Sequence, residues 1–133
     1  MILRSLAAAV LAVHGLIHLI GFLVPWRIAQ VEGFAYRTTA LGGSVELGAN
    51  GVMIVGLAWL AIAVGFVVAG VGVWRRASWA LGLTAGLAIA SLVVCVLGLP
   101  ETVAGLVVNV ALLAAAVWVT FIRRADTGAG VER

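Results

Sequence analysis

The chain has 133 residues, of which 65% are hydrophobic and only 10% are charged, with a formal net charge of +3. Because a soluble domain needs about a quarter of its residues charged to cover its surface, this composition excludes a soluble fold and indicates that lipid is the solvent. The positive charge lies in small groups of arginine between apolar runs, without the basic surface of a nucleic-acid-binding protein, so nucleic acid is excluded as a partner.

Four apolar runs follow one another along the chain, at residues 3–24, 47–74, 78–99 and 102–122. Each is near or above the ~20 residues that a helix needs to cross a bilayer. The first run is too long for the apolar part of a secretory signal, so it is predicted to remain in the protein as a membrane helix. The last three runs are separated by very short connections, so these helices are predicted to be antiparallel neighbours.

The predicted fold class is an all-α polytopic membrane protein, in which residues 1–125 form one four-transmembrane-helix bundle with up-down-up-down order. Residues 25–46 are the only sizeable segment between the runs, and their mixed aromatic and charged side chains suit either a short interfacial helix or an ordered loop. The Gly-rich polar segment 126–133 is predicted to be a disordered cytoplasmic tail.

The arginines divide unequally between the two sides of such a bundle. One side carries Arg4, Arg75, Arg76, Arg123 and Arg124, and the other carries Arg27 and Arg37 together with Glu32 and Glu46. Because Lys and Arg concentrate in cytoplasmic loops, the first side is predicted to face the cytoplasm, with both chain termini inside.

Two histidines, His14 and His18, lie one helical turn apart in the first run and share a face. Polar side chains in hydrocarbon are costly, so this face is predicted to turn into the bundle. Two interpretations stay open: the pair ligates a metal or relays protons, or it forms neutral hydrogen bonds that hold helices together. Zinc, copper and haem are the candidate cofactors of the first interpretation, and the second needs none.

The fourth run carries Glu101, Gly105 and Asn109 at intervals of four residues, on one face of the helix. Counting about 1.5 Å of rise per residue places His18 and Asn109 at a similar depth. Each side chain leans toward the start of its own helix, so these two are predicted to converge.

Three further polar residues belong to the same prediction. Ser91 of the third run reaches the level of Asn109, and Glu46 and Asn50 stand at the outer end of the second run. Polar side chains at membrane depth need partners, so together they predict a polar pocket that opens outward, lined by His18, Asn109, Asn50 and Glu101.

Three glycines are predicted to serve helix packing. Gly82 and Gly86, followed by Ala90, form a small-xxx-small face of the kind that packs membrane helices, either within the bundle or in a dimer. Gly105 has no side chain and lets a neighbouring element approach the fourth helix closely.

Two stretches resemble those of a known group of proteins. One runs from His14 to Phe22 and begins His-Gly-Leu-Ile-His, and the other is the acid-x3-Gly-x3-Asn pattern from Glu101 to Asn109. Trp59 and Ser91 match as well. On these residues the chain resembles a widespread group of small, uncharacterised four-helix bacterial membrane proteins. The resemblance implies a bacterial inner membrane and assigns no activity. The fourth helix departs from the group, because Glu101-Thr102-Val103 stands where relatives have Asp-Ala-Lys. In length and helix number the chain is also distantly similar to DoxX-like proteins, whose hallmark residues it lacks.

Three functions remain open on the sequence alone. The first is a non-enzymatic accessory subunit or assembly module, whose partners are the bilayer and either a second copy or a larger membrane complex. Short loops and small-residue faces favour it. The second is a metal- or haem-binding redox module that uses His14 and His18. The third is a small transporter or proton-coupled carrier, against which the lack of a broken span or an inverted repeat argues.

Overall fold

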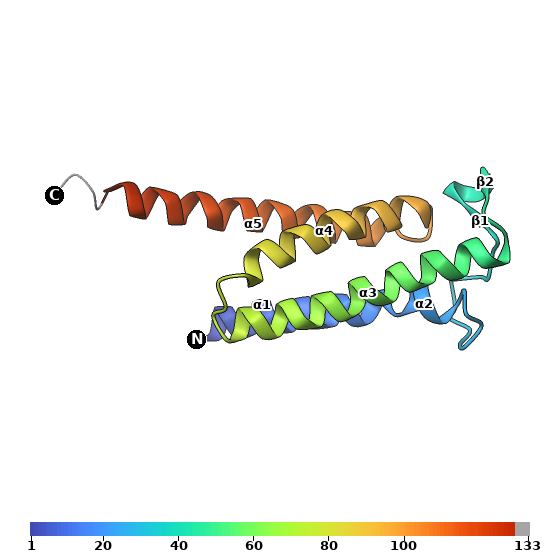
Figure 1. Ribbon diagram of the computed structural model, residues 1–133, viewed down its shortest axis with the longest axis horizontal. Coiled ribbons are helices and arrows are strands. Elements are labelled where there is room, and N and C mark those ends of the chain that lie inside the picture. The colour runs from blue at the N-terminus through green and yellow to red at the C-terminus, as the bar shows by residue number, and fades with distance from the viewer. Residues whose placement is uncertain (130–133) are drawn as a thin grey trace.

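The computed structural model describes the backbone of residues 1–129 and the side chains of residues 1–122. Its long helices are α1 (Ile2–His18), which the short α2 (Ile20–Leu23) extends, α3 (Gly48–Trp74), α4 (Ala80–Leu97) and α5 (Val103–Ala129). They run along one axis, with both ends of the described chain at the same end of the bundle (Figure 1). Four segments are long and apolar enough to cross a membrane: Ile2–Leu23, Gly48–Trp74, Ala80–Leu97 and Val103–Ile122. The predicted all-α, four-span fold class is confirmed.

The last helix continues beyond its predicted end at residue 122. α5 reaches Ala129, because no proline interrupts the chain there. The backbone of residues 126–129, which belongs to the expected disordered tail, is therefore helical. The rest of that tail, residues 130–133, lies outside the described residues.

The segment between α2 and α3 forms an ordered loop and no interfacial helix. Its strands β1 (Thr39–Ala40) and β2 (Val45–Glu46) pair antiparallel, with Thr39 opposite Glu46 and Ala40 opposite Val45. The turn between them, the 3-10 helix η1 (Leu41–Gly43), has positive φ at all three of its residues, a conformation that glycine adopts without steric cost. The Gly42 N–H donates to the Leu99 carbonyl at 2.9 Å, so the hairpin is tied to the turn between α4 and α5.

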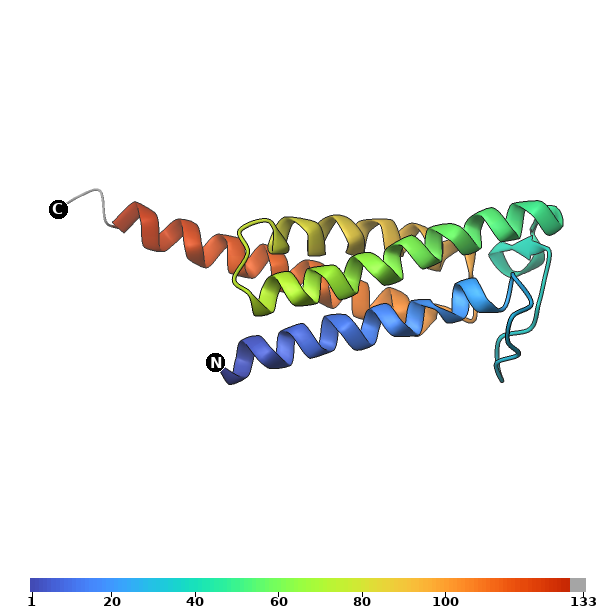
Figure 2. The same ribbon diagram turned by 60° about the horizontal axis from the view of Figure 1, so that its bottom comes forward.

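The helices pack in the order α1–α3–α4–α5, as the rotated view shows (Figure 2). Glycines bring α1 and α3 together: a Cβ at Gly15 would lie 2.7 Å from the Ala63 carbonyl oxygen, and one at Gly70 would lie 2.8 Å from that of Ala8. The core beside this contact is built around Phe66, which has no exposed surface, and includes Leu11, Ile62, Ala69, Ala88 and Val94.

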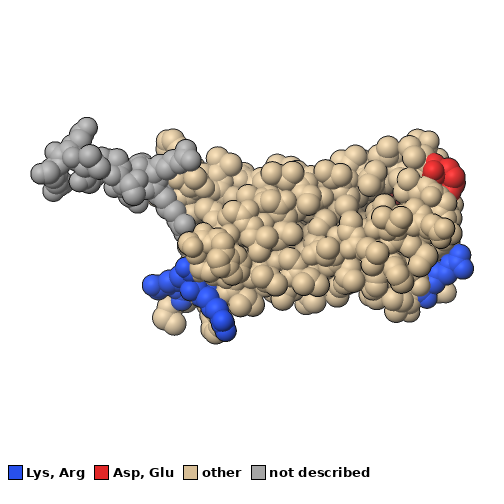
Figure 3. All heavy atoms as spheres, viewed as in Figure 1, with Lys and Arg blue, Asp and Glu red and all other residues tan. Residues whose placement is uncertain are grey.

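The sides of the bundle are apolar. On the face drawn in Figure 3, the charged side chains of the described residues lie only at the two ends, and the long band of described residues between them carries none. Large hydrophobic side chains of the long helices are exposed, for example Ile54, Val64, Val107 and Val117. Such a surface suits hydrocarbon, so the chain is an integral membrane protein in a lipid environment.

The small-residue face of α4 is not in close contact with a neighbouring described helix. A Cβ at Gly82 or at Gly86 would meet nothing within 4 Å, so neither glycine packs against another described helix of this chain. Of the two alternatives that the sequence left open, packing within the bundle does not occur for these two glycines, because the rotation of α4 directs Thr84, Ala88 and Ser91 inward instead. Packing against a second chain stays a prediction. Gly105 does face a neighbour, since its Cβ would lie 2.9 Å from the Cys95 Sγ.

Candidate functional site

The two histidines of α1 lie inside the bundle. Only 6% of His14 and 2% of His18 is exposed, which agrees with the inward face expected from their spacing. Their rings meet edge to face at 4.5 Å between centroids, and both contact Phe66 of α3. The His18 ring also lies 5.0 Å from that of Trp59, for which Gly21 makes room, since any Cβ there would overlap the indole.

Hydrogen bonds join these rings to α4 and α5 in a closed circuit. His14 Nε2 lies 3.2 Å from Asn109 Oδ1, and Asn109 Nδ2 donates to Ser91 Oγ at 2.7 Å. Ser91 Oγ lies 2.5 Å from His18 Nε2, and His18 Nδ1 lies 2.8 Å from the His14 carbonyl oxygen. Three helices that are separate in sequence are therefore linked through four buried side chains, which we call the polar circuit: His14, His18, Ser91 and Asn109.

The direction of every bond in the polar circuit follows from two carbonyl groups, which can only accept. Asn109 Nδ2 also donates to the Gly105 carbonyl at 2.8 Å, which fixes the orientation of the amide, so Asn109 Oδ1 accepts and His14 Nε2 donates. The His14 carbonyl likewise makes His18 Nδ1 the donor. In the described part of the chain neither ring belongs to an ion pair, and an unpaired buried charge is costly, so both rings are neutral. His18 Nε2 then accepts from Ser91.

The pairing differs in detail from the expected one. His18 was predicted to meet Asn109, whereas Asn109 bonds directly to His14, and His18 reaches it through Ser91. The depth count assumed straight helices normal to the membrane. A tilt or a shift of α5 by one helical turn exchanges one histidine for the other, and the sequence does not carry that information.

The polar circuit does not suit a metal ion or a haem. A metal needs a nitrogen lone pair from each imidazole, but His18 donates from one nitrogen and accepts at the other. Within residues 1–122 no group of three or more His, Cys, Asp or Glu side chains could hold a metal ion. Binding through both histidines would require breaking the circuit, so the arrangement favours the hydrogen-bonding interpretation.

Ser91 Oγ and His18 Nε2 are as close as a nucleophile and its general base, but both side chains are buried. Ser91 has no exposed surface, and its hydroxyl already accepts from Asn109. A nucleophile must reach the substrate, and nothing in the described structure opens a path to this oxygen.

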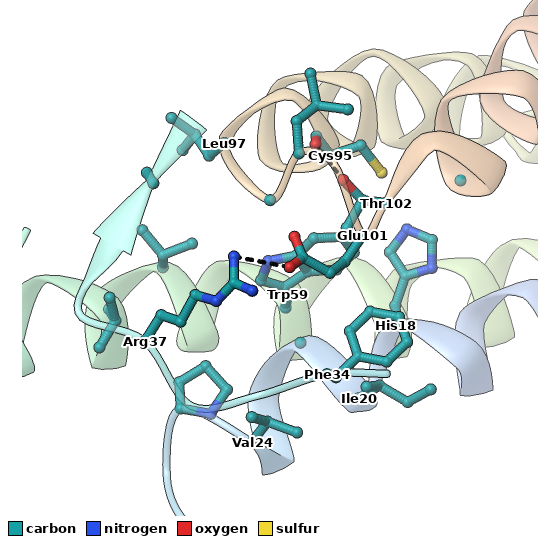
Figure 4. A pocket seen from close by; sticks show the side chains of 18 of the residues that line it. His18, Ile20, Val24, Phe34, Arg37, Trp59, Cys95, Leu97, Glu101 and Thr102 are labelled. Carbon is teal, nitrogen blue, oxygen red and sulfur yellow. Dashed lines mark hydrogen bonds and ion pairs between the residues drawn. The ribbon is translucent and has the colours of Figure 1, made fainter. Parts of the chain in front are cut away.

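A cavity of about 280 Å³ lies beside the polar circuit, toward the β-hairpin. It is bounded by α1, α2, α3, the end of α4, the start of α5 and the loop after α2 (Figure 4). His14 and His18 lie on its wall, and its other lining side chains are mostly apolar, among them Ile20, Val24, Phe34, Val55, Trp59 and Leu97. This volume is close to the lower end of the ~300–1,000 Å³ typical of small-molecule pockets.

An ion pair stands at the loop side of this cavity. Arg37 Nη1 lies 2.8 Å from Glu101 Oε1, and Figure 4 shows the two side chains facing each other. Glu101, at the turn before α5, thus has its cationic partner in the loop. Both side chains belong to the cavity wall.

Four residues of the predicted polar site do not line the cavity. Ser91 and Asn109 are fully buried within the polar circuit, and two others lie outside. Glu46 and Asn50 are exposed, and neither lines the cavity. Glu46 Oε1 instead accepts from the Gly48 N–H at 2.9 Å. The prediction was wrong for them because the hairpin places β2 and the first turn of α3 outside the space between α1 and α5.

Sequence reasoning gave no role in the pocket to Arg37 and Trp59. Arg37 was counted only as a loop charge and Trp59 only as a matching residue, because nothing local in the sequence ties either to Glu101 or His18.

Comparisons of the chain with protein-family models, curated proteins and solved structures found no match. What the site can do therefore follows from its own geometry.

Proposed function

We propose that this protein is a non-enzymatic membrane module that binds a small, largely apolar molecule in the cavity beside the polar circuit. The cavity carries the proposal. Its walls are mostly apolar, and its volume of about 280 Å³ suits a molecule of one or two rings better than a whole phospholipid. His14 and His18 contribute to the wall of the cavity, and the polar circuit holds both rings in place through Ser91 and Asn109.

The cavity has a lateral side toward the lipid. Ile17 of α1 is 56% exposed and Val108 of α5 is 37% exposed, and both line the cavity. A molecule dissolved in the bilayer would reach the cavity between these two helices without crossing water. This route favours an apolar ligand over a hydrophilic one.

The location follows from the charges and from the resemblance. We place the chain in a bacterial inner membrane, as a member of the group of four-helix proteins that it resembles, with both termini in the cytoplasm. Arg4, Arg75 and Arg76 support this orientation, while Arg27 and Arg37 share the opposite end with acidic residues. A cysteine at Thr38 should react with an impermeant thiol reagent added to intact cells, and one at Gly128 should not. The reverse pattern would overturn the orientation.

Binding of naphthalene to the purified protein in lipid nanodiscs tests the proposed function. Tritiated naphthalene should bind in a saturable manner and be displaced by unlabelled naphthalene. Ala104→Trp is the matched control, because Ala104 lines the cavity but is exposed on α5, so the indole should fill the cavity without disturbing the core. Equal, non-saturable uptake by both proteins would mean partition into lipid and would refute the proposal.

A second candidate, an accessory or assembly module of a larger membrane complex, is favoured by the outward face of α4. Gly82, Gly86 and Ala90 are exposed there, and small residues on a lipid-facing helix allow a second helix to approach. Gly82→Leu combined with Gly86→Leu should reduce cross-linking to a neighbouring chain without lowering the thermal stability of the monomer. Unchanged cross-linking would remove this candidate.

A further inference from the structure

We infer that the molecule bound in the cavity is neutral and carries a hydroxyl group, which donates a hydrogen bond to His14 Nδ1. This inference rests on the proposed function and adds the chemical class of the ligand. It follows from the directions of the hydrogen bonds in the polar circuit, from the place of His14 on the cavity wall, and from the charge at the loop side.

The polar circuit uses three of the four ring nitrogens of its histidines. His18 uses both, as a donor to the His14 carbonyl and as an acceptor from Ser91. His14 uses only Nε2, which donates to Asn109 Oδ1. A neutral imidazole with its proton on Nε2 carries a lone pair on Nδ1, so Nδ1 of His14 is an acceptor outside the circuit.

The tautomer of His14 is held in place from α5. Moving the proton to Nδ1 would leave two acceptors, His14 Nε2 and Asn109 Oδ1, facing each other at 3.2 Å. The Asn109 amide cannot rotate to compensate, because its Nδ2 donates to both Ser91 Oγ and the Gly105 carbonyl. Nδ1 therefore remains an acceptor, and a ligand that meets it needs a donor.

Because His14 lies on the cavity wall, its Nδ1 acceptor should favour ligands that carry a hydrogen-bond donor. The residue lines the cavity although only 6% of it is exposed, so little water competes for its lone pair. Among the neighbouring polar groups on the wall, Thr102 Oγ1 donates to the Cys95 carbonyl, and His18 is fully engaged. An apolar ligand would leave Nδ1 buried without a partner, which weakens its binding relative to a ligand with a donor.

The loop side of the cavity argues for a neutral ligand. Arg37 and Glu101 neutralise each other at 2.8 Å, so neither an anion nor a cation meets an uncompensated opposite charge there. A phenol or a compact alcohol satisfies both conditions, because its hydroxyl reaches His14 while its hydrocarbon part contacts Trp59, Phe34 and Leu97.

A displacement series of three related probes tests the inference on the full-length protein in nanodiscs. Naphthol, methoxynaphthalene and naphthalene each compete with tritiated naphthalene; the first has a hydroxyl donor, the second has the same oxygen without the donor, and the third has neither. Naphthol should displace the label at about tenfold lower concentration, which corresponds to one satisfied hydrogen bond worth about 1.4 kcal/mol. Methoxynaphthalene should not gain this advantage.

His14→Phe should lose the preference for naphthol, so that in this variant naphthol and naphthalene displace the label at equal concentrations, whatever the absolute affinity for naphthalene becomes. If this variant does not fold, NMR of isotope-labelled histidine nitrogens gives an independent readout, because the chain has only two histidines. The non-protonated Nδ1 of His14 should shift on addition of naphthol and not of methoxynaphthalene. A protonated His14 Nδ1, or no shift with bound naphthol, would overturn the inference.

Failure of this inference differs from failure of the proposed function. Saturable binding of all three probes with equal affinity would refute the hydroxyl requirement and leave the binding function standing. Absence of saturable binding by every probe would refute both.

Discussion

The two halves of the bundle are built differently. In the half near the chain termini, which we call the closed half, α1 meets α3 at Gly70. Gly15 and the fully buried Phe66 lie at the inner limit of this half, where Phe66 contacts both histidine rings. In the half near the β-hairpin, the open half, α1 and α5 are separated by a cavity of about 280 Å³. The polar circuit lies at the boundary between the two.

This difference shows how a chain this apolar can hold a cavity. Lipid tails are as apolar as the core, so the hydrophobic effect does not drive the helices together and close packing must do so. The closed half supplies that packing through glycines at backbone contacts. The open half also has close contacts at glycines, where Gly21 packs on Trp59 and Gly56 on Trp26. Its edges are held by the polar circuit at one side and by the hairpin at the other, where the Gly42 N–H donates to the Leu99 carbonyl.

The largest expected effect comes from removing an aromatic ring in the closed half. Phe66→Ala should lower the free energy of unfolding by about 3 kcal/mol. This value is at the low end of the range for a buried phenylalanine, because the ring of the natural protein meets lipid and not water when the helices separate. Phe34→Ala in the open half is the matched control and should cost much less, since Phe34 borders the cavity. Unfolding titrations in mixed micelles measure both, and equal losses would contradict the contrast between the halves.

Overpacking the contact between α1 and α3 should come next. Gly70→Leu places a side chain where a Cβ already lies 2.8 Å from the Ala8 carbonyl oxygen, and the backbone there cannot yield easily. We expect a loss of about 1–3 kcal/mol, measured as a lower midpoint of thermal unfolding. Gly82→Leu, which meets nothing within 4 Å, should leave the midpoint unchanged. A neutral Gly70→Leu would show that α1 and α3 are not in backbone contact.

Breaking the boundary between the halves should cost about 1–2 kcal/mol. Asn109→Leu removes the partner of His14 Nε2 and the donor to Ser91, and buried polar groups without partners are unfavourable. Val107→Leu, on the lipid-facing side of the same helix, serves as the control. His18→Gln should be milder, because an amide can replace part of the hydrogen bonding. If Asn109→Leu were as stable as its control, the polar circuit would have no role in stability.

The smallest effect should follow loss of the ion pair at the loop side. Arg37→Gln should change the free energy of unfolding by less than about 1 kcal/mol, because 51% of the Arg37 side chain is exposed to water. The same variant should loosen the loop, so its backbone amides should exchange hydrogen faster than in the natural protein. A large loss of stability would mean that the pair holds the open half together more strongly than its exposure indicates.

The sequence by itself determined the parts of this protein that depend on local pattern. Runs of about 20 apolar residues predict spans regardless of their neighbours, because the thickness of the bilayer sets the length of a helix. The spacing of His14 and His18 likewise predicts one shared face, since the pitch of the helix alone decides it, and the cost of burying polar groups in lipid turns that face inward.

Only the tertiary structure decided which residues meet. It paired Asn109 with His14, joined Arg37 of the loop to Glu101 before α5, left Glu46 and Asn50 outside the cavity, and turned Gly82 and Gly86 outward. Each outcome depends on the tilt, rotation and axial shift of one helix against another. Those quantities arise from the packing of many side chains together, and no single spacing in the sequence records them.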